Sequence, residues 1–137
     1  MRPTMDALLD DAAEQGILVQ RATCMPAGLR GAYHLDTRTI VLRAGMPDRL
    51  AVPTLMHELA HAFRGDDGHQ DGAVEAHINR AVACRLITPD AYRRAEASVG
   101  PHLGALAVEL DVARWVVIAY QSTLRTTKVA PPVSHRE

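Results

Sequence analysis

The stretch that is most informative about the fold is Thr54-Leu55-Met56-His57-Glu58-Leu59-Ala60-His61. It falls in a region from Pro47-Asp48 to about Arg64 that we predict to be helical. Pro53 lies inside this region, so we expect either a kink or a new first turn there. We expect the helix to pack against the rest of the domain, because an apolar stripe runs along one side of it: Met56, Leu59, Ala60 and Phe63.

The segments on either side of this helix complete an α+β pattern. Before it, Thr4 can cap a helix that begins at Met5 and ends at Gly16. Three strands are predicted next, at 17–21, 32–35 and 39–43, and the last two read as a hairpin. After the central helix we expect helices at about 73–87 and 89–100, with one or two more within 103–124. The order predicts an N-terminal helix, a short antiparallel sheet of about three strands, and then a helical bundle.

Length and composition favour a single small domain. A chain of 137 residues is one domain by the usual length prior, which we place at residues 1–124. Residues 125–137 include Pro131-Pro132 and are expected to be a disordered tail. The formal net charge of −1 predicts no basic surface for nucleic acid or an anionic membrane. The longest apolar stretch, Trp115 to Tyr120, is too short to span a bilayer.

The cysteines and the N-terminus bear on the compartment. Cys24 and Cys84 are far apart and fit no metal or redox spacing, so we interpret both as buried free thiols. Met1-Arg2-Pro3-Thr4 lacks the apolar run of a signal peptide. Together these features predict a reducing, cytoplasmic setting.

His57 and His61 form the most specific chemical pattern in the chain. Residues four apart lie one turn apart on the same face of a helix, so both imidazoles can reach one Zn²⁺ ion. Glu58 sits on the neighbouring face, where a carboxylate can act as general base on a water that the zinc makes more acidic. Two surface histidines on an amphipathic helix would produce the same sequence pattern. The apolar stripe instead favours a packed helix that carries a metal site.

The third metal ligand is less closely defined by the motif. One pattern that follows two such histidines would use Asp67, although Arg64 then occupies the position where glycine is usual. The other common solution is a carboxylate on the following helix, and Glu75 fits it. Asp66 and His69, in the same loop as Asp67, are further candidates. A structural role for Glu75 is also possible, because a glutamate in the first turn of a helix is favoured by the helix dipole.

The flanking residues resemble the ImmA/IrrE family of bacterial and phage metallopeptidases. The resemblance covers about residues 5–124 and rests on five segments: Gly31-Ala32-Tyr33, Arg38-Thr39-Ile40-Val41-Leu42, Thr54 to His61, Glu75-Ala76-His77-Ile78-Asn79, and Ala83-Cys84-Arg85-Leu86-Ile87-Thr88-Pro89. It implies a zincin-like domain with Glu75 as the third zinc ligand. It also implies an endopeptidase that cleaves a helix-turn-helix repressor and so releases phage, mobile-element or stress genes.

Two other functions are compatible with parts of the sequence. The first is a non-catalytic regulator, an antirepressor that binds a repressor and keeps a structural zinc site, although such a site has no use for Glu58. The second is a DNA-binding protein, because Ala107, Asp111 and Val117 have helix-turn-helix spacing. We do not expect DNA binding, since the second helix would then expose an apolar run, Trp115 to Ile118.

The sequence does not identify the group that would stabilise a tetrahedral oxyanion. Such a group must donate a hydrogen bond at the site of reaction. The candidate donors are Tyr33, His34, His77 and Tyr92. The oligomeric state is also left open.

Overall fold

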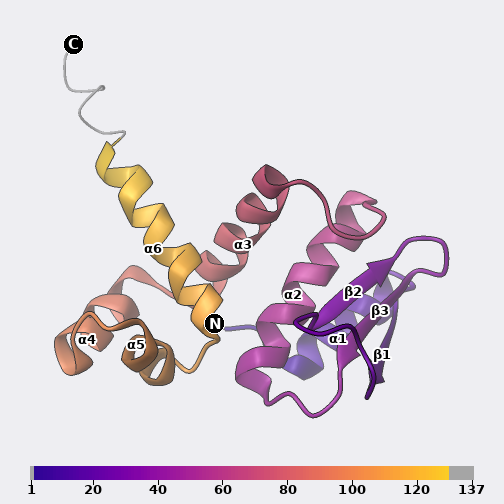
Figure 1. Cartoon of the computed structure of the whole chain (residues 1–137), viewed down its shortest axis with the longest axis horizontal. Helices are drawn as coiled ribbons and strands as arrows, with labels where there is room; N and C mark the ends of the chain where they lie inside the picture. The colour runs from indigo at the N-terminus through magenta and orange to yellow at the C-terminus, as the bar shows by residue number, and fades with distance from the viewer. Residues whose placement is uncertain (1, 130–137) are drawn as a thin grey trace. The chain divides into compact units, whose positions relative to one another are not determined.

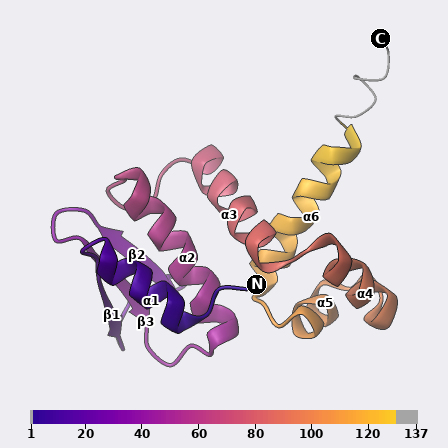
Figure 2. The same ribbon diagram turned by 180° about the vertical axis from the view of Figure 1, so that it is seen from behind.

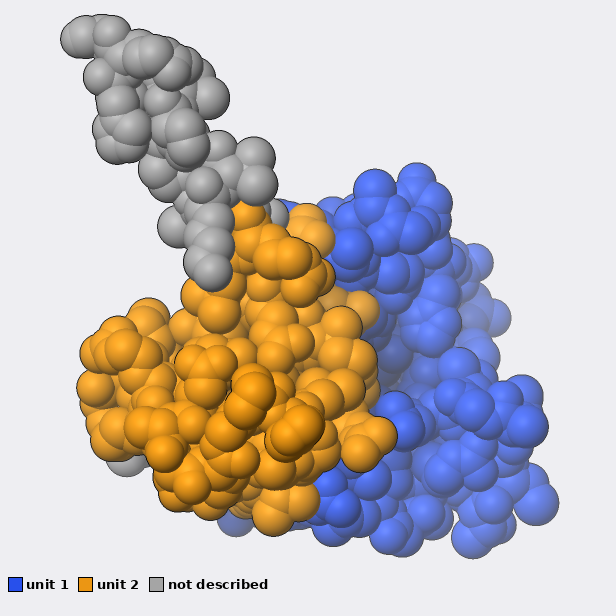
Figure 3. Space-filling view, turned by 60° about the vertical axis from the view of Figure 1, so that its left-hand side comes forward, with its two compact units in different colours: residues 1–78 blue, residues 79–137 orange. Residues whose placement is uncertain are grey.

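The computed structural model describes residues 2–129 and has the α+β architecture expected from the sequence. The chain groups into two compact units, residues 1–78 and 79–137 (Figure 3), where the sequence had predicted one domain over 1–124. The elements, labelled in Figure 1, are α1 (Met5–Glu14), β1 (Leu18–Ala22), β2 (Gly31–His34), β3 (Thr39–Arg43), α2 (Asp48–Arg64), α3 (Gly72–Leu86), α4 (Pro89–Val99), α5 (Leu103–Leu110) and α6 (Arg114–Val129).

The three strands form one mixed sheet in the order β1-β3-β2. β2 and β3 are the predicted hairpin, paired antiparallel with Tyr33 opposite Ile40. β1 instead runs parallel to β3, so the prediction of an antiparallel sheet is wrong for this pair. The reason is that β1 and β2 are not neighbours: the loop at 23–30 takes the chain to the far edge of the sheet, and β3 turns back from β2 into the central position beside β1.

α1 and α2 pack together on the sheet of the first unit (Figure 2). α1 contacts β1 and α2, and α2 contacts β2 and β3. Leu55 of α2 and Ile40 of β3 are completely buried in this core. Burying a leucine side chain stabilises the fold by roughly 1.5–3 kcal/mol. The apolar stripe of α2 is shorter than predicted, because Phe63 lies in its last turn and is 58% exposed.

The second unit contains α4, α5 and α6, and α6 carries the apolar run from Trp115 to Ile118. Asp111 joins α5 to α6 in the left-handed conformation, with φ 56°. Val116 and Val117 of α6 are completely buried. The apolar run that a DNA-reading helix would have to expose is therefore mostly buried, and Ile118 is its one residue that is half exposed.

Two further predictions differ from the structure. Cys24 and Cys84 are free thiols as predicted, but both are exposed rather than buried. Cys24 lies in the loop after β1, and Cys84 faces away from the buried Val82 and Leu86 of α3. α6 continues to Val129, so the predicted start of the tail at Arg125 falls inside a helix, and 130–137 lie outside the described residues. Among residues 2–129, no helix is both long and apolar enough to cross a membrane.

Candidate metal centre

α2 positions the two histidines of the sequence motif. The helix begins after Pro47, whose backbone is extended, and ends at Gly65, which adopts the left-handed conformation with φ 80°. Glycine is favoured there because it has no side chain to clash in that conformation. Pro53 lies within the helix, so the alternative that a new helix starts there is wrong.

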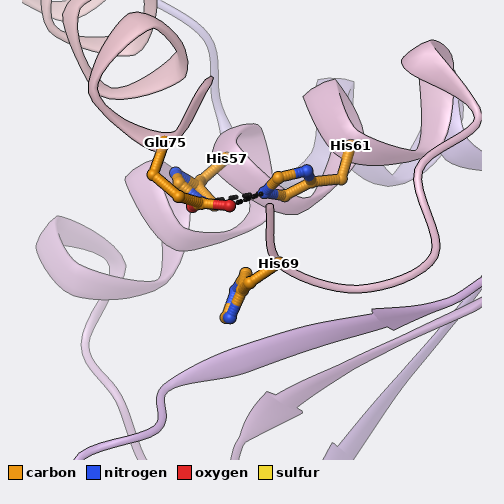
Figure 4. Close-up of side chains that lie close together, drawn as sticks. All are labelled: His57, His61, His69 and Glu75. Carbon is orange, nitrogen blue, oxygen red and sulfur yellow. Dashed lines mark hydrogen bonds and ion pairs between the residues drawn. The ribbon is translucent and has the colours of Figure 1, made fainter. Parts of the chain in front are cut away.

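His57, His61 and Glu75 bring two ring nitrogens and one carboxylate close together (Figure 4). The Nε2 atom of His57 lies 2.8 Å from Oε1 of Glu75, and Nε2 of His61 lies 3.0 Å from Oε2 of the same carboxylate. The two Nε2 atoms are 3.2 Å apart. Tetrahedral zinc with bonds of about 2.0–2.1 Å separates its ligand atoms by roughly 3.3 Å. The three side chains thus already have nearly the spacing of metal ligands.

Glu75 is fixed by the turn that starts α3. The carboxylate of Asp71 accepts a hydrogen bond from the Val74 N–H, which caps the helix. The backbone N–H of Gln70 donates to Oε2 of Glu75 at 2.6 Å. Burial raises the pKa of Glu75, but the Gln70 N–H and the neighbouring His61 and His57 outweigh it and lower the pKa overall. Glu75 is therefore held as a carboxylate facing the histidines.

Asp66 lies on the other nitrogen of His61. Its Oδ2 atom is 2.8 Å from Nδ1 of His61 and accepts a hydrogen bond from Nε of Arg64 at 2.7 Å. These two hydrogen bonds lower the pKa of Asp66, so the carboxylate acts as an acceptor. A proton on Nδ1 leaves the lone pair of His61 on Nε2, where it faces Glu75 and His57.

Glu58 is buried beside this cluster, at 2% exposure. The β2 strand approaches it so closely that a Cβ atom on Gly31 would lie 3.3 Å from Cγ of Glu58 and 2.8 Å from Cγ2 of Thr54. Oε2 of Glu58 lies 3.1 Å from Nε2 of His69. The other oxygen, Oε1, is buried and has no hydrogen-bond partner within the described part of the chain.

His69 is a fourth member of the cluster. One ligand atom from each of His57, His61, His69 and Glu75 can be chosen so that all lie within 4.8 Å of one another. His69 comes from the loop between α2 and α3, and its ring lies apart from the other three (Figure 4). Asp67, the remaining loop candidate from the sequence, is exposed and is not one of these four.

The proposed oxyanion donors have different surroundings. Tyr33 is buried on β2, and within residues 2–129 its hydroxyl has no hydrogen-bond partner. His34 and His77 are exposed. Tyr92 belongs to the second unit, where its hydroxyl accepts a hydrogen bond from Gln121 and its ring lies 5.0 Å from that of Tyr120.

The donor set fits a metal cation. Two ring nitrogens and an ionised carboxylate converge in a largely buried space, and a cation balances the charge that such a carboxylate brings. Imidazole and carboxylate together suit zinc and several other divalent metals. The group can therefore hold a metal ion. Sequence reasoning identified all four residues, but it did not foresee that Asp66 would support His61 or that Gly31 would contact Glu58.

Comparisons with known proteins give no further guide to function: a scan against models of protein families finds no match, and a search of curated proteins finds no similar sequence.

Proposed function

We propose that this chain is a zinc-dependent endopeptidase whose metal ligands are His57, His61 and Glu75 and whose general base is Glu58. The proposal is carried by one observation: the Nε2 atoms of His57 and His61 lie 3.2 Å apart, each within 3.0 Å of an oxygen of Glu75, next to a buried glutamate. Catalytic zinc sites in proteins have three protein ligands and one open position. The two histidines and Glu75 supply that number.

Each residue of the site has a task in peptide hydrolysis. When bound, zinc would acidify a water and polarise the substrate carbonyl. Glu58 accepts a proton from the attacking water and passes it to the leaving amine, for which one carboxylate oxygen without a fixed partner is suited. Asp66 holds His61 in the tautomer that presents Nε2 as a ligand.

The substrate we propose is a helix-turn-helix repressor, cleaved in the cytoplasm, with release of phage, mobile-element or stress genes. This part of the proposal rests on the ImmA/IrrE resemblance, which includes Gly31, the zinc motif and Glu75. The contact of Gly31 with Glu58 supports it, because it gives a physical reason for glycine at that position.

A second function deserves a test because His69 completes a set of four possible ligands. A site closed by four protein ligands is typical of structural zinc. The chain would then be a non-catalytic antirepressor that binds its repressor without cutting it. A buried glutamate beside the ligands favours the peptidase, since a structural site gains nothing from it.

The experiment compares the zinc-loaded chain with Glu58→Gln on purified helix-turn-helix repressors from the source genome, taken in order of gene proximity. We expect cleavage by the parent and a loss of at least ~10²-fold in the variant, with unchanged zinc content. Glu109→Gln, at an exposed glutamate of α5, is the matched control. Equal cleavage by parent and Glu58→Gln would remove Glu58 from the reaction. Tight binding of a repressor without cleavage would favour the antirepressor.

A further inference from the structure

The loop between α2 and α3 is tied to the metal centre on both sides of His69. Before it, Asp66 binds Nδ1 of His61. After it, the Gln70 N–H donates to Glu75. Gly68, directly before His69, has φ +79°, a conformation that glycine adopts without strain. The loop therefore holds His69 next to the site by its neighbours in sequence, independently of the contact that His69 makes with Glu58.

His69 differs from the other three residues of the group in spacing and exposure. The Nε2 atoms of His57 and His61 lie 3.2 Å apart and each lies within 3.0 Å of a Glu75 oxygen, whereas the group that includes His69 spans up to 4.8 Å. The side chain of His69 is 41% exposed, while His61 is completely buried. Three of the four residues thus belong to helices and are mostly buried, whereas the fourth comes from an exposed loop.

We propose that His69 is an exchangeable fourth ligand, which closes the metal site in the resting protein and must withdraw before a substrate carbonyl can enter. Its Nε2 atom now lies 3.1 Å from Glu58, so the ring occupies the space next to the general base. Whether the ring binds the metal or contacts Glu58, it occupies the space that a substrate carbonyl needs. This inference rests on the metal site of the proposed function, but not on the chain being a peptidase.

The position of His69 on a loop allows its side chain to withdraw from the site. The other ligands belong to the helices α2 and α3, whereas His69 lies between Gly65 and Gly72 in a segment without regular structure. Moving a loop side chain breaks fewer packed contacts than moving a helix. A protein substrate that docks on this exposed loop can therefore withdraw His69 without disturbing His57, His61 or Glu75.

The test measures zinc coordination in the full chain, apart from any hydrolysis. X-ray absorption of the zinc-loaded protein counts imidazole ligands, and chelator competition gives the zinc affinity. We expect three imidazoles in the parent and two in His69→Ala, with zinc affinity lowered at least about tenfold. The matched control is His77→Ala, which removes an exposed histidine of α3 outside the group. It should behave like the parent.

Acetohydroxamate, a small chelating probe, reports whether the fourth position is open. We expect it to bind the zinc-loaded His69→Ala variant at least about tenfold more tightly than the parent, since no side chain has to be displaced. His69→Gln separates two roles, because its amide can still donate to Glu58 but is a poor zinc ligand. It should match His69→Ala.

Three results would overturn the inference. They are two imidazoles in the parent, equal zinc affinity in parent and His69→Ala, or a His69→Gln variant that matches the parent. Failure of the proposed peptidase would look different: the coordination results would stand as expected, while no repressor would be cleaved.

Discussion

Nδ1 of His61 lies 2.8 Å from Oδ2 of Asp66, while Nε2 of the same ring lies 3.0 Å from Oε2 of Glu75. One completely buried imidazole thus joins two carboxylates from different segments, the loop after α2 and the first turn of α3. The two carboxylates have different tasks. In the proposed metal site, Asp66 orients the ring and Glu75 is a ligand beside it.

Asp66→Asn is expected to weaken zinc binding by about 10–100-fold without abolishing it, because the amide can present its NH₂ group to Nδ1 and favour the wrong tautomer. Zinc affinity by chelator competition measures the effect. Asp67→Asn, at an exposed position of the same loop outside the group of ligands, controls for loss of a loop charge. Equal affinity in Asp66→Asn and the parent would show that the His61 contact is not used in metal binding.

Glu75→Ala is expected to reduce zinc binding far more than Asp67→Ala, because Glu75 has both carboxylate oxygens within 3.0 Å of histidine nitrogens. Asp67→Ala removes an exposed carboxylate of the same loop and should leave affinity within twofold of the parent, a small effect typical of surface sites. Zinc stoichiometry after dialysis and affinity by chelator competition decide the matter. The assignment fails if the Asp67 variant loses the metal and the Glu75 variant keeps it.

Gly31→Ala is expected to destabilise the fold by about 1–3 kcal/mol, since its Cβ would lie 2.8 Å from a methyl group of Thr54 and force α2 and β2 apart. The same shift should displace Glu58. Urea denaturation measures the free energy of unfolding. Gly72→Ala is the control, because a Cβ there meets nothing within 4 Å and its φ is not positive. A Gly31→Ala variant with the same free energy of unfolding as the parent would show that β2 and α2 can move apart without destabilising the fold.

The metal-free protein is expected to lose stability in acid through Glu75 and Asp66. Both carboxylates have a pKa lowered from its ordinary value, 4.5 for Glu75 and 3.8 for Asp66. A group with a lowered pKa in the folded state stabilises it above the ordinary value, and this contribution is lost as the pH falls through the lowered value. Free energies of unfolding in EDTA should therefore fall below about pH 4.5.

The double variant Asp66→Asn/Glu75→Gln separates these two groups from the other carboxylates of the chain. Its stability should depend less on pH between roughly pH 5 and pH 3 than that of the parent. Asp67→Asn, at an exposed position, should leave the parent's slope unchanged. Parallel curves for the double variant and the parent would show that neither carboxylate is stabilised by folding.

The sequence by itself determined the features that depend on neighbouring residues along the chain. The Thr4 cap of α1, the hairpin of β2 and β3 and the α+β order were predicted and are present. The placement of His57 and His61 on one face of α2 follows from helical periodicity alone. These features need no knowledge of packing, because each is fixed by hydrogen bonds within a few residues.

Tertiary structure decided which residues far apart in sequence share a site. Glu75 is eighteen positions after His57, and the sequence could only rank it above Asp66, Asp67 and His69. In the packed structure Glu75 contacts the Nε2 atoms of the two histidines. Asp66 contacts Nδ1 of His61, and His69 contacts Glu58. Packing also made β1 parallel to β3. Separations of 2.8–3.1 Å depend on how helices, loop and sheet are packed, and no local pattern in the chain encodes that.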